Sequence, residues 1–124
     1  MAARTPEDVH RLFAEAINGG DLNAILALYE PTAILVPQPR QLAKGHAAIR
    51  EALSGYLAMK PRFALQPGKV LASEDIALLF SKWTLTGTGP GGSTVQLAGQ
   101  TTDVVRRQKD GNWLLVIDNP FGLG

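Results

Sequence analysis

The sequence predicts an α+β domain in which helices pack on one face of an antiparallel sheet. Apolar residues recur at helical spacing through most of the first half, and they alternate or run continuously, as in strands, through the second half. Helices grouped before strands are typical of this class. The expected order of elements is α-α-β-α-β-β-β-β.

The first helix is expected to begin after Thr5, a residue type that caps helices, and Pro6 suits its first turn. One apolar stripe follows at helical spacing, formed by Val9, Leu12, Phe13, Ala16 and Ile17. The run Asn18-Gly19-Gly20 is typical of a helix end. His10 lies on the polar side of this helix, so we predict a solvated surface residue.

Two further helices and a short strand are expected before residue 62. A short helix capped by Asp21 should carry Tyr29 at its end, with the ring inward, and stop at Pro31. Residues 33–36 favour a strand, and a third helix should start near His46 and end before Pro61.

The second half is expected to hold four strands, over residues 62–72, 76–86, 94–107 and 113–119. Pro67-Gly68 lies inside the first of them, which indicates a bulge or a sheet edge. One face of the second strand carries Ala77, Leu79, Ser81 and Trp83. The opposite face has no helix left to cover it and is apolar at Ile76, Leu78, Phe80, Leu114 and Val116. An isologous homodimer would bury that outer face.

Length and composition exclude several classes of protein. The 124 residues fit one domain, spanning 1–124, and the net charge of +1 gives no reason to expect nucleic acid or a membrane as partner. Without cysteine there is no thiolate metal site, and the two histidines lie 36 positions apart. We expect no cofactor or metal. No secretory signal or membrane-length apolar run is visible, so a cytoplasmic location is expected.

Three segments carry a family resemblance. Residues 13–29 (FAEAINGGDLNAILALY), residues 45–50 (GHAAIR) and residues 102–107 (TDVVRR) followed by DGNW at 110–113 resemble the SnoaL-like and ketosteroid-isomerase-like group of the nuclear-transport-factor-2-like superfamily. The resemblance implies three helices on a curved sheet that encloses a conical apolar pocket, often in a homodimer. Its members include isomerases, cyclases, dehydratases, epoxide hydrolases and binding domains, so the fold does not fix the function.

The steroid-isomerase residues are largely missing. That chemistry needs a carboxylate base, and a tyrosine and a neutral aspartic acid that hold the enolate oxygen. By the resemblance, Phe13 stands in the tyrosine's place, Val36 in the base's place, and Asp103 matches the aspartic acid. We therefore expect no efficient steroid isomerase. The epoxide-hydrolase variant needs a second inward carboxylate, and the sequence indicates none.

Asp103 is the leading candidate residue. It shares strand parity with Thr101 and Val105, so it should face the enclosed side, where burial raises the pKa of a carboxyl group. It would then serve as a general acid or a hydrogen-bond donor; a purely structural, hydrogen-bonded aspartate is the alternative. Asp118 has the opposite parity in the last strand and is assigned to the dimer side or solvent.

Three residues are candidates for a second polar group in the site. Asn119 could orient a carbonyl or a water, His46 could act as acid or base, and Tyr56 could replace the missing tyrosine. A turn residue, a surface histidine and a core tyrosine are the respective alternatives. The expected pocket lining is Phe13, Tyr29, Val36, Leu79, Ser81, Trp83, Thr101 and Ile117.

The sequence thus favours a protein that holds a small hydrophobic molecule. One hypothesis is a cofactor-independent enzyme acting by general acid–base chemistry on a hydrophobic carbonyl compound. The alternatives are a binding domain without turnover and a dimerisation module.

Overall fold

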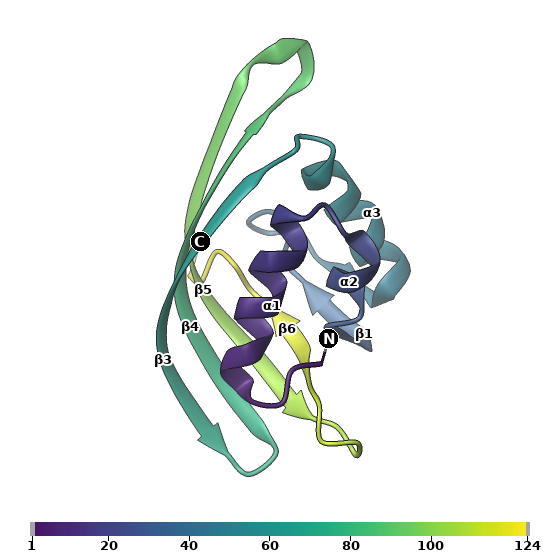
Figure 1. Cartoon of the computed structure of the whole chain (residues 1–124), viewed down its shortest axis with the longest axis vertical. Helices are drawn as coiled ribbons and strands as arrows, with labels where there is room; N and C mark the ends of the chain where they lie inside the picture. The colour runs from purple at the N-terminus through teal and green to yellow at the C-terminus, as the bar shows by residue number, and fades with distance from the viewer. Residues whose placement is uncertain (1, 124) are drawn as a thin grey trace.

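The computed structural model of the chain describes residues 2–123 and forms a helical layer against one curved sheet (Figure 1). Its helices are α1 (Pro6–Asn18), α2 (Leu22–Leu26) and α3 (Gly45–Leu57), with a 3-10 turn at Pro90–Gly92. Its strands are β1 (Tyr29–Leu35), β2 (Ala43–Lys44), β3 (Arg62–Ser73), β4 (Ile76–Thr88), β5 (Thr94–Arg107) and β6 (Trp113–Asp118). The predicted α+β class is confirmed.

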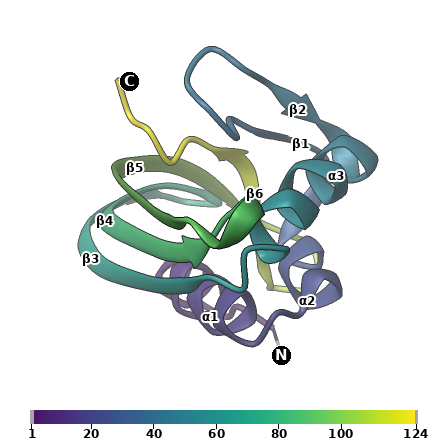
Figure 2. The same cartoon turned by 90° about the horizontal axis from the view of Figure 1, so that it is seen from above.

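The strands form one six-stranded sheet in the order β2-β1-β6-β5-β4-β3. The sheet bends around α1 and remains open, as the view from above shows (Figure 2). The predicted antiparallel pairing holds except between β1 and β6, which run parallel. After β1 and β2 the chain crosses through α3 to β3 at the opposite edge of the sheet. It then returns strand by strand through β4 and β5 to β6, which lies beside β1.

The local signals for α1 and β3 are confirmed. Thr5 and Asp8 form a reciprocal capping box that satisfies backbone N–H groups at the start of α1. β3 lies at the sheet edge, and its register with β4 shifts between Pro67 and Val70. An edge position suits a strand that contains proline, because the missing N–H breaks no central ladder.

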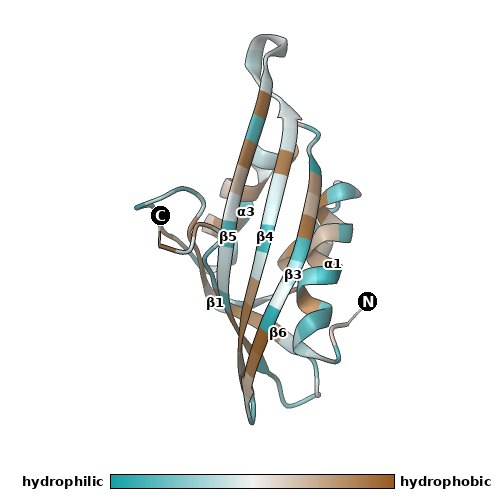
Figure 3. Ribbon diagram, turned by 90° about the vertical axis from the view of Figure 1, so that its left-hand side faces the viewer, coloured by the Kyte–Doolittle hydropathy of each residue, from teal (hydrophilic) through white to brown (hydrophobic). Residues whose placement is uncertain are grey.

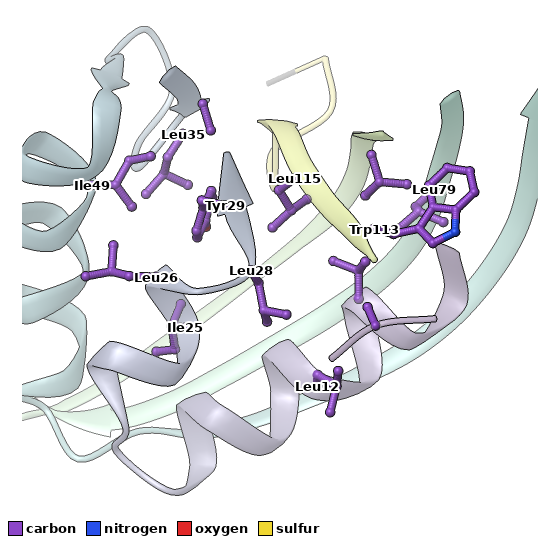
Figure 4. Packing of buried hydrophobic residues seen from close by; sticks show 14 of the residues in the cluster. Leu12, Ile25, Leu26, Leu28, Tyr29, Leu35, Ile49, Leu79, Trp113 and Leu115 are labelled. Atoms are coloured by element: carbon purple, nitrogen blue, oxygen red, sulfur yellow. The ribbon is translucent and has the colours of Figure 1, made fainter. Parts of the chain in front are cut away.

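The inner face of the sheet and the helices enclose the core. Along β4 the buried residues alternate as predicted, from Ala77 to Leu85, because successive side chains point to opposite faces. Figure 4 shows the close packing of Leu12, Leu79, Trp113 and Leu115 around this core.

The prediction that Tyr29 ends the second helix is wrong. α2 stops at Leu26, and Tyr29 opens β1, paired with Leu115 of β6. The tyrosine ring is inward as expected, and the residue is 1% exposed. The helical spacing misled because the apolar run from Leu22 to Tyr29 serves a short helix and then a strand.

The prediction for the end of the last strand is also wrong. Val104 pairs with Ile117 and Val105 pairs with Leu115, so Val116 is an extra residue in β6. Such a bulge reverses the side-chain alternation beyond it. Asp118 consequently points inward and is buried, whereas Ile117 is exposed on the outer face.

The longest helices described, α1 and α3, have 13 residues each. Within residues 2–123, no helix has both the length and the apolar character that a membrane crossing requires.

Candidate functional site

A pocket lies between α1, α3, the inner face of the sheet and the segment that follows β6. Its volume is about 70 Å³. Most of its lining is apolar and aromatic, with Phe13, Phe63, Trp83 and Phe121 among the rings. The polar side chains at its wall are His10, Tyr56, Thr101, Asp103 and Asp118. The pocket therefore combines an apolar wall with a few converging polar groups, which is typical of a ligand site.

Aromatic rings form a continuous wall across the pocket. Phe63 lies edge-on to Phe13, with ring centres 6.0 Å apart, and stacks on Trp83 at 5.9 Å. Phe121 meets Trp83 edge-on at 5.7 Å. The Trp83 Nε1–H donates to the Pro120 carbonyl at 2.7 Å, which holds the C-terminal segment against the sheet.

The Trp83 contact depends on Gly99, the residue directly opposite in β5. A Cβ atom at Gly99 would lie 2.9 Å from the Trp83 ring and 2.5 Å from the Pro120 carbonyl oxygen. Glycine is thus the residue that allows the indole and the C-terminal segment to approach the strand so closely.

Four buried side chains meet at the polar side of the pocket, and we call them the acid cluster: His10, Tyr29, Asp103 and Asp118. His10 Nε2 lies 2.6 Å from Asp103 Oδ2, and the Asn119 backbone N–H donates to Asp103 Oδ1 at 2.8 Å. The Tyr29 hydroxyl donates to Asp118 Oδ2, and the Asp103 and Asp118 carboxyl groups lie close enough for each to shift the pKa of the other. α1, β1, β5 and β6 each contribute one member.

Burial dominates the protonation of the acid cluster, because no lysine or arginine neutralises it among the described contacts. Burial raises the pKa of Asp103 to about 7 and raises the pKa of Asp118 well above its usual value, where the neighbouring Asp103 charge adds to the effect. Burial lowers the pKa of the His10 imidazole, against the opposing influence of Asp118. Near neutral pH the pair therefore carries a proton between its two carboxyl groups.

This arrangement offers an acid and a base in one place. A neutral carboxyl group donates a hydrogen bond or a proton, and the ionised partner beside it accepts one. A group with a pKa near 7 suits both roles at neutral pH. Asp103 and Asp118 both line the pocket, so a bound molecule can contact either.

Of the four predicted catalytic residues, Asp103 and Tyr56 line the pocket, but the Tyr56 hydroxyl donates to the Pro37 carbonyl instead of facing the carboxyl pair. The Asn119 side chain donates to the Gly122 carbonyl at 2.8 Å, and its backbone serves Asp103. His46 donates to the Tyr29 carbonyl at 2.9 Å and lies outside the pocket lining.

Of the eight residues predicted to line the pocket, Phe13, Trp83 and Thr101 do so. The others lie elsewhere: Tyr29, Val36, Leu79, Ser81 and Ile117. Among these, Tyr29 reaches the site through its bond to Asp118, and the Val36 N–H donates to the Asp118 backbone carbonyl at 2.9 Å. Ile117 does not line the pocket because the bulge in β6 turns its side chain to the outer face.

Sequence reasoning missed two members of the acid cluster. His10 is buried, which corrects the predicted surface residue, and Asp118 is the second inward carboxylate that the sequence was expected to lack. A signal for His10 existed, since it precedes Phe13 by three positions and Ile17 by seven and so lies on their side of α1. Within residues 2–123, no group of three or more metal-ligating side chains is arranged to hold a metal ion.

Comparisons with known proteins agree with the fold. The family model of the SnoaL-like domain matches residues 9–116. A search of curated proteins found no match. Among solved structures, the chain is similar to a ketosteroid isomerase-like protein from Erwinia carotovora atroseptica, with a TM-score of 0.80, 24% identity, and 91% and 89% of the two chains covered.

Two further structures are similar at lower identity. A conserved protein from Planctomyces limnophilus has a TM-score of 0.81 at 16% identity over 93% of this chain and 91% of the other. A nuclear transport factor 2-like superfamily protein from Salmonella enterica serovar Typhimurium has a TM-score of 0.79 at 18% identity over 90% and 84%. At such identities the likeness shows the shared fold and leaves the chemistry to the site.

Proposed function

Because the chain belongs to the SnoaL-like family, we propose that it is a small-molecule enzyme that needs no cofactor and moves a proton next to a carbonyl group. The substrate would be a small, mostly apolar carbonyl compound. The observation that carries this proposal is the pair of buried carboxyl groups, Asp103 and Asp118, at the wall of an otherwise apolar pocket.

In the proposed reaction one carboxyl group acts as the base and the other as the acid. Asp103 as carboxylate takes a proton from the carbon beside the substrate carbonyl, and the C–H electron pair passes to the carbonyl oxygen. Asp118 gives its proton to that oxygen, so an enol forms. Return of the enol proton to Asp118 and of the first proton from Asp103 to a different carbon completes an isomerisation with all protons conserved. Tyr29 supports Asp118 through its hydroxyl hydrogen bond.

Pocket size argues for a small substrate. A cavity of about 150 Å³ is enough for benzene. The pocket here, at about 70 Å³, accepts a ring compound only if a side chain such as Tyr56 or Phe121 turns aside. A steroid is far larger, which agrees with the absence of the steroid-isomerase residues at Phe13 and Val36.

The saturated hydrogen bonding of Asp103 favours a second candidate, a binding domain without turnover. Both Asp103 oxygens already have protein partners, His10 and the Asn119 N–H. In that case the aromatic wall binds an apolar ligand and the carboxyl pair only orients it.

Deuterium uptake separates the two candidates. Cyclopentanone and 2-cyclopentenone are incubated with the protein in D₂O, and NMR follows exchange at the carbon beside the carbonyl. The proposal predicts exchange above the buffer rate that falls by about a hundredfold or more in Asp103→Asn and Asp118→Asn. Asp75→Asn, an exposed carboxyl outside the pocket, is the matched control. Saturable binding of these ketones without exchange would favour the binding domain.

We also propose that two copies pair through the outer face of the sheet. Leu71 and Ile76 are 51% and 44% exposed there. Apolar segments gather where β3 meets β4 on the face shown in Figure 3. Light scattering after size exclusion is expected to give a dimer, and Ile76→Glu is expected to give a monomer. A monomeric wild type would contradict this.

A further inference from the structure

His10 lies between two hollows of the molecule. On one side it lines the apolar pocket beside Asp103. On the other side it lines an open groove of about 600 Å³ between α1 and strands β3 and β4, which we call the outer groove. Among the residues described, His10 and Leu65 line both hollows, and of these two only His10 can carry a proton.

The two nitrogens of the imidazole have different surroundings. Nε2 lies 2.6 Å from Asp103 Oδ2. Within residues 2–123, no hydrogen bond engages Nδ1, and the only fully buried side-chain polar atom without a partner is Ser81 Oγ. Nδ1 therefore keeps contact with solvent, although the His10 side chain is only 9% exposed.

The other partners of the carboxyl pair lead back into the protein. The Asn119 N–H is a backbone group, and Tyr29, which bonds to Asp118, is itself 1% exposed. The pocket side is walled by aromatic rings, which bind water poorly. Among the described hydrogen bonds, the one that leads from Asp103 toward solvent outside the pocket is the one to His10.

We propose that His10 relays protons between Asp103 and water in the outer groove. This inference rests on the proposed function, because it gives the carboxyl pair a way to exchange protons while a substrate closes the pocket. A neutral imidazole accepts a proton at one nitrogen and releases one from the other, so the transfer leaves the ring unchanged apart from its tautomer. His10 acts here through Asp103 and needs no contact with substrate.

The charges around the outer groove are compatible with this role. From α1, Glu7, Arg11 and Glu15 line the groove, and Arg11 is paired with Asp8 and Glu15. The groove residues from β3 and β4 are uncharged, so the ionisable groups that face His10 from the sheet are Asp103 and Asp118. Arg11 is the one lysine or arginine among the described groove-lining residues, and its charge is balanced by the Asp8 and Glu15 carboxylates.

Proton exchange of the carboxyl pair is measured on the substrate-free protein labelled with ¹³C at aspartate. Line shapes of the Asp103 carboxyl carbon near its titration midpoint give the exchange rate with water. In His10→Gln and His10→Ala we expect that rate to fall by about a hundredfold, the lower end of the range for a lost acid–base group. Added imidazole should restore exchange in His10→Ala, since the outer groove is open to a molecule of that size.

Two further variants test the relay without changing His10, in case a substitution of His10 disturbs folding. Ala14→Leu places a larger side chain one turn along α1, in the groove lining beside His10, and should also slow exchange. Arg11→Gln changes a groove residue that has no contact with the carboxyl pair and should leave the rate unchanged.

Wild-type exchange rates in His10→Gln and Ala14→Leu would overturn the relay. Slow exchange that imidazole does not restore in a folded His10→Ala would overturn it as well. Because no substrate is present, failure of the ketone assay leaves this test intact, and failure of this test leaves the ketone assay intact.

Discussion

Two buried carboxyl sites lie on opposite faces of the same strands. One site holds a proton near neutral pH, and the carboxyl group of the other is ionised. On the inner face, Tyr29 of β1 and Asp103 of β5 belong to the acid cluster. On the other face, the next residue of β1, Glu30, accepts two hydrogen bonds of 2.8 Å from Arg106 of β5 and one of 2.7 Å from Gln108. We call Glu30, Arg106 and Gln108 the Glu30 cluster.

The partner of each carboxyl group decides its charge. The Arg106 guanidinium lowers the pKa of Glu30, against a smaller opposing effect of burial, so Glu30 stays ionised. The acid cluster has only a histidine, a tyrosine and a second acid, and burial raises the pKa values of both its aspartic acids. Burial alone therefore says little about function, whereas burial without a cation marks a group held ready for proton transfer.

The largest expected effect is on the pH dependence of stability. Raised pKa values mean that, above about pH 4, the folded protein retains protons that the unfolded chain has released, so stability falls as pH rises. For Asp103, a rise of the pKa from 3.8 to about 7 corresponds to about 4 kcal/mol lost between pH 4 and 7. The raised pKa of Asp118 adds to this fall, and the lowered pKa of His10 opposes it below about pH 6.5.

Urea unfolding at a series of pH values measures this slope. The double variant Asp103→Asn/Asp118→Asn should lose most of the fall between pH 4 and 7, because neither amide ionises. The Glu30 cluster contributes in the opposite sense, since its lowered pKa stabilises the fold above about pH 4.5 and is lost as the pH falls below it. Stability that rises from pH 5 to 7 in the wild type would contradict the comparison.

A smaller effect is expected from breaking the Glu30 cluster. Arg106→Ala leaves a buried carboxylate without its cation and should cost about 1–2 kcal/mol, reduced because the arginine side chain is 48% exposed. Arg107→Ala is the control, since Arg107 and Asp75 are both largely exposed and their pair should contribute below about 0.5 kcal/mol. Urea unfolding measures the loss of stability in both variants. Equal losses would contradict the claim that the buried Glu30 depends on its cation.

The smallest effect is expected from Tyr29→Phe. It removes the hydroxyl that donates to Asp118 and should cost about 1 kcal/mol, with a further rise in the Asp118 pKa. Urea unfolding gives the first quantity and aspartate carboxyl NMR gives the second. A lowered Asp118 pKa in this variant would contradict the hydrogen bond.

The sequence predicts the fold better than the site, for reasons visible at single residues. Periodicity is a local property, so it was sufficient for α1, α3 and the long strands β4 and β5. It also placed Asp103 on the inner face, where the alternation along β5 is unbroken.

The two residues were missed for different reasons. Asp118 turns inward because Val116 forms a bulge, and no residue type at that point indicates a bulge, so a single sequence leaves this open. His10 lies at helical spacing from Phe13 and Ile17, so the periodicity of α1 did carry a signal for its burial.

The most direct test of the central claim is a carboxyl ¹³C NMR titration of Asp103, Asp118 and Glu30 in one sample. The coupled pair should titrate with an apparent midpoint near 7 for Asp103 and one well above the usual aspartate value for Asp118, while Glu30 titrates below about 4.5. Midpoints of Asp103 and Asp118 both at or below about 4 would mean two ionised carboxylates at neutral pH. That result would contradict the shared proton and the acid–base function built on it.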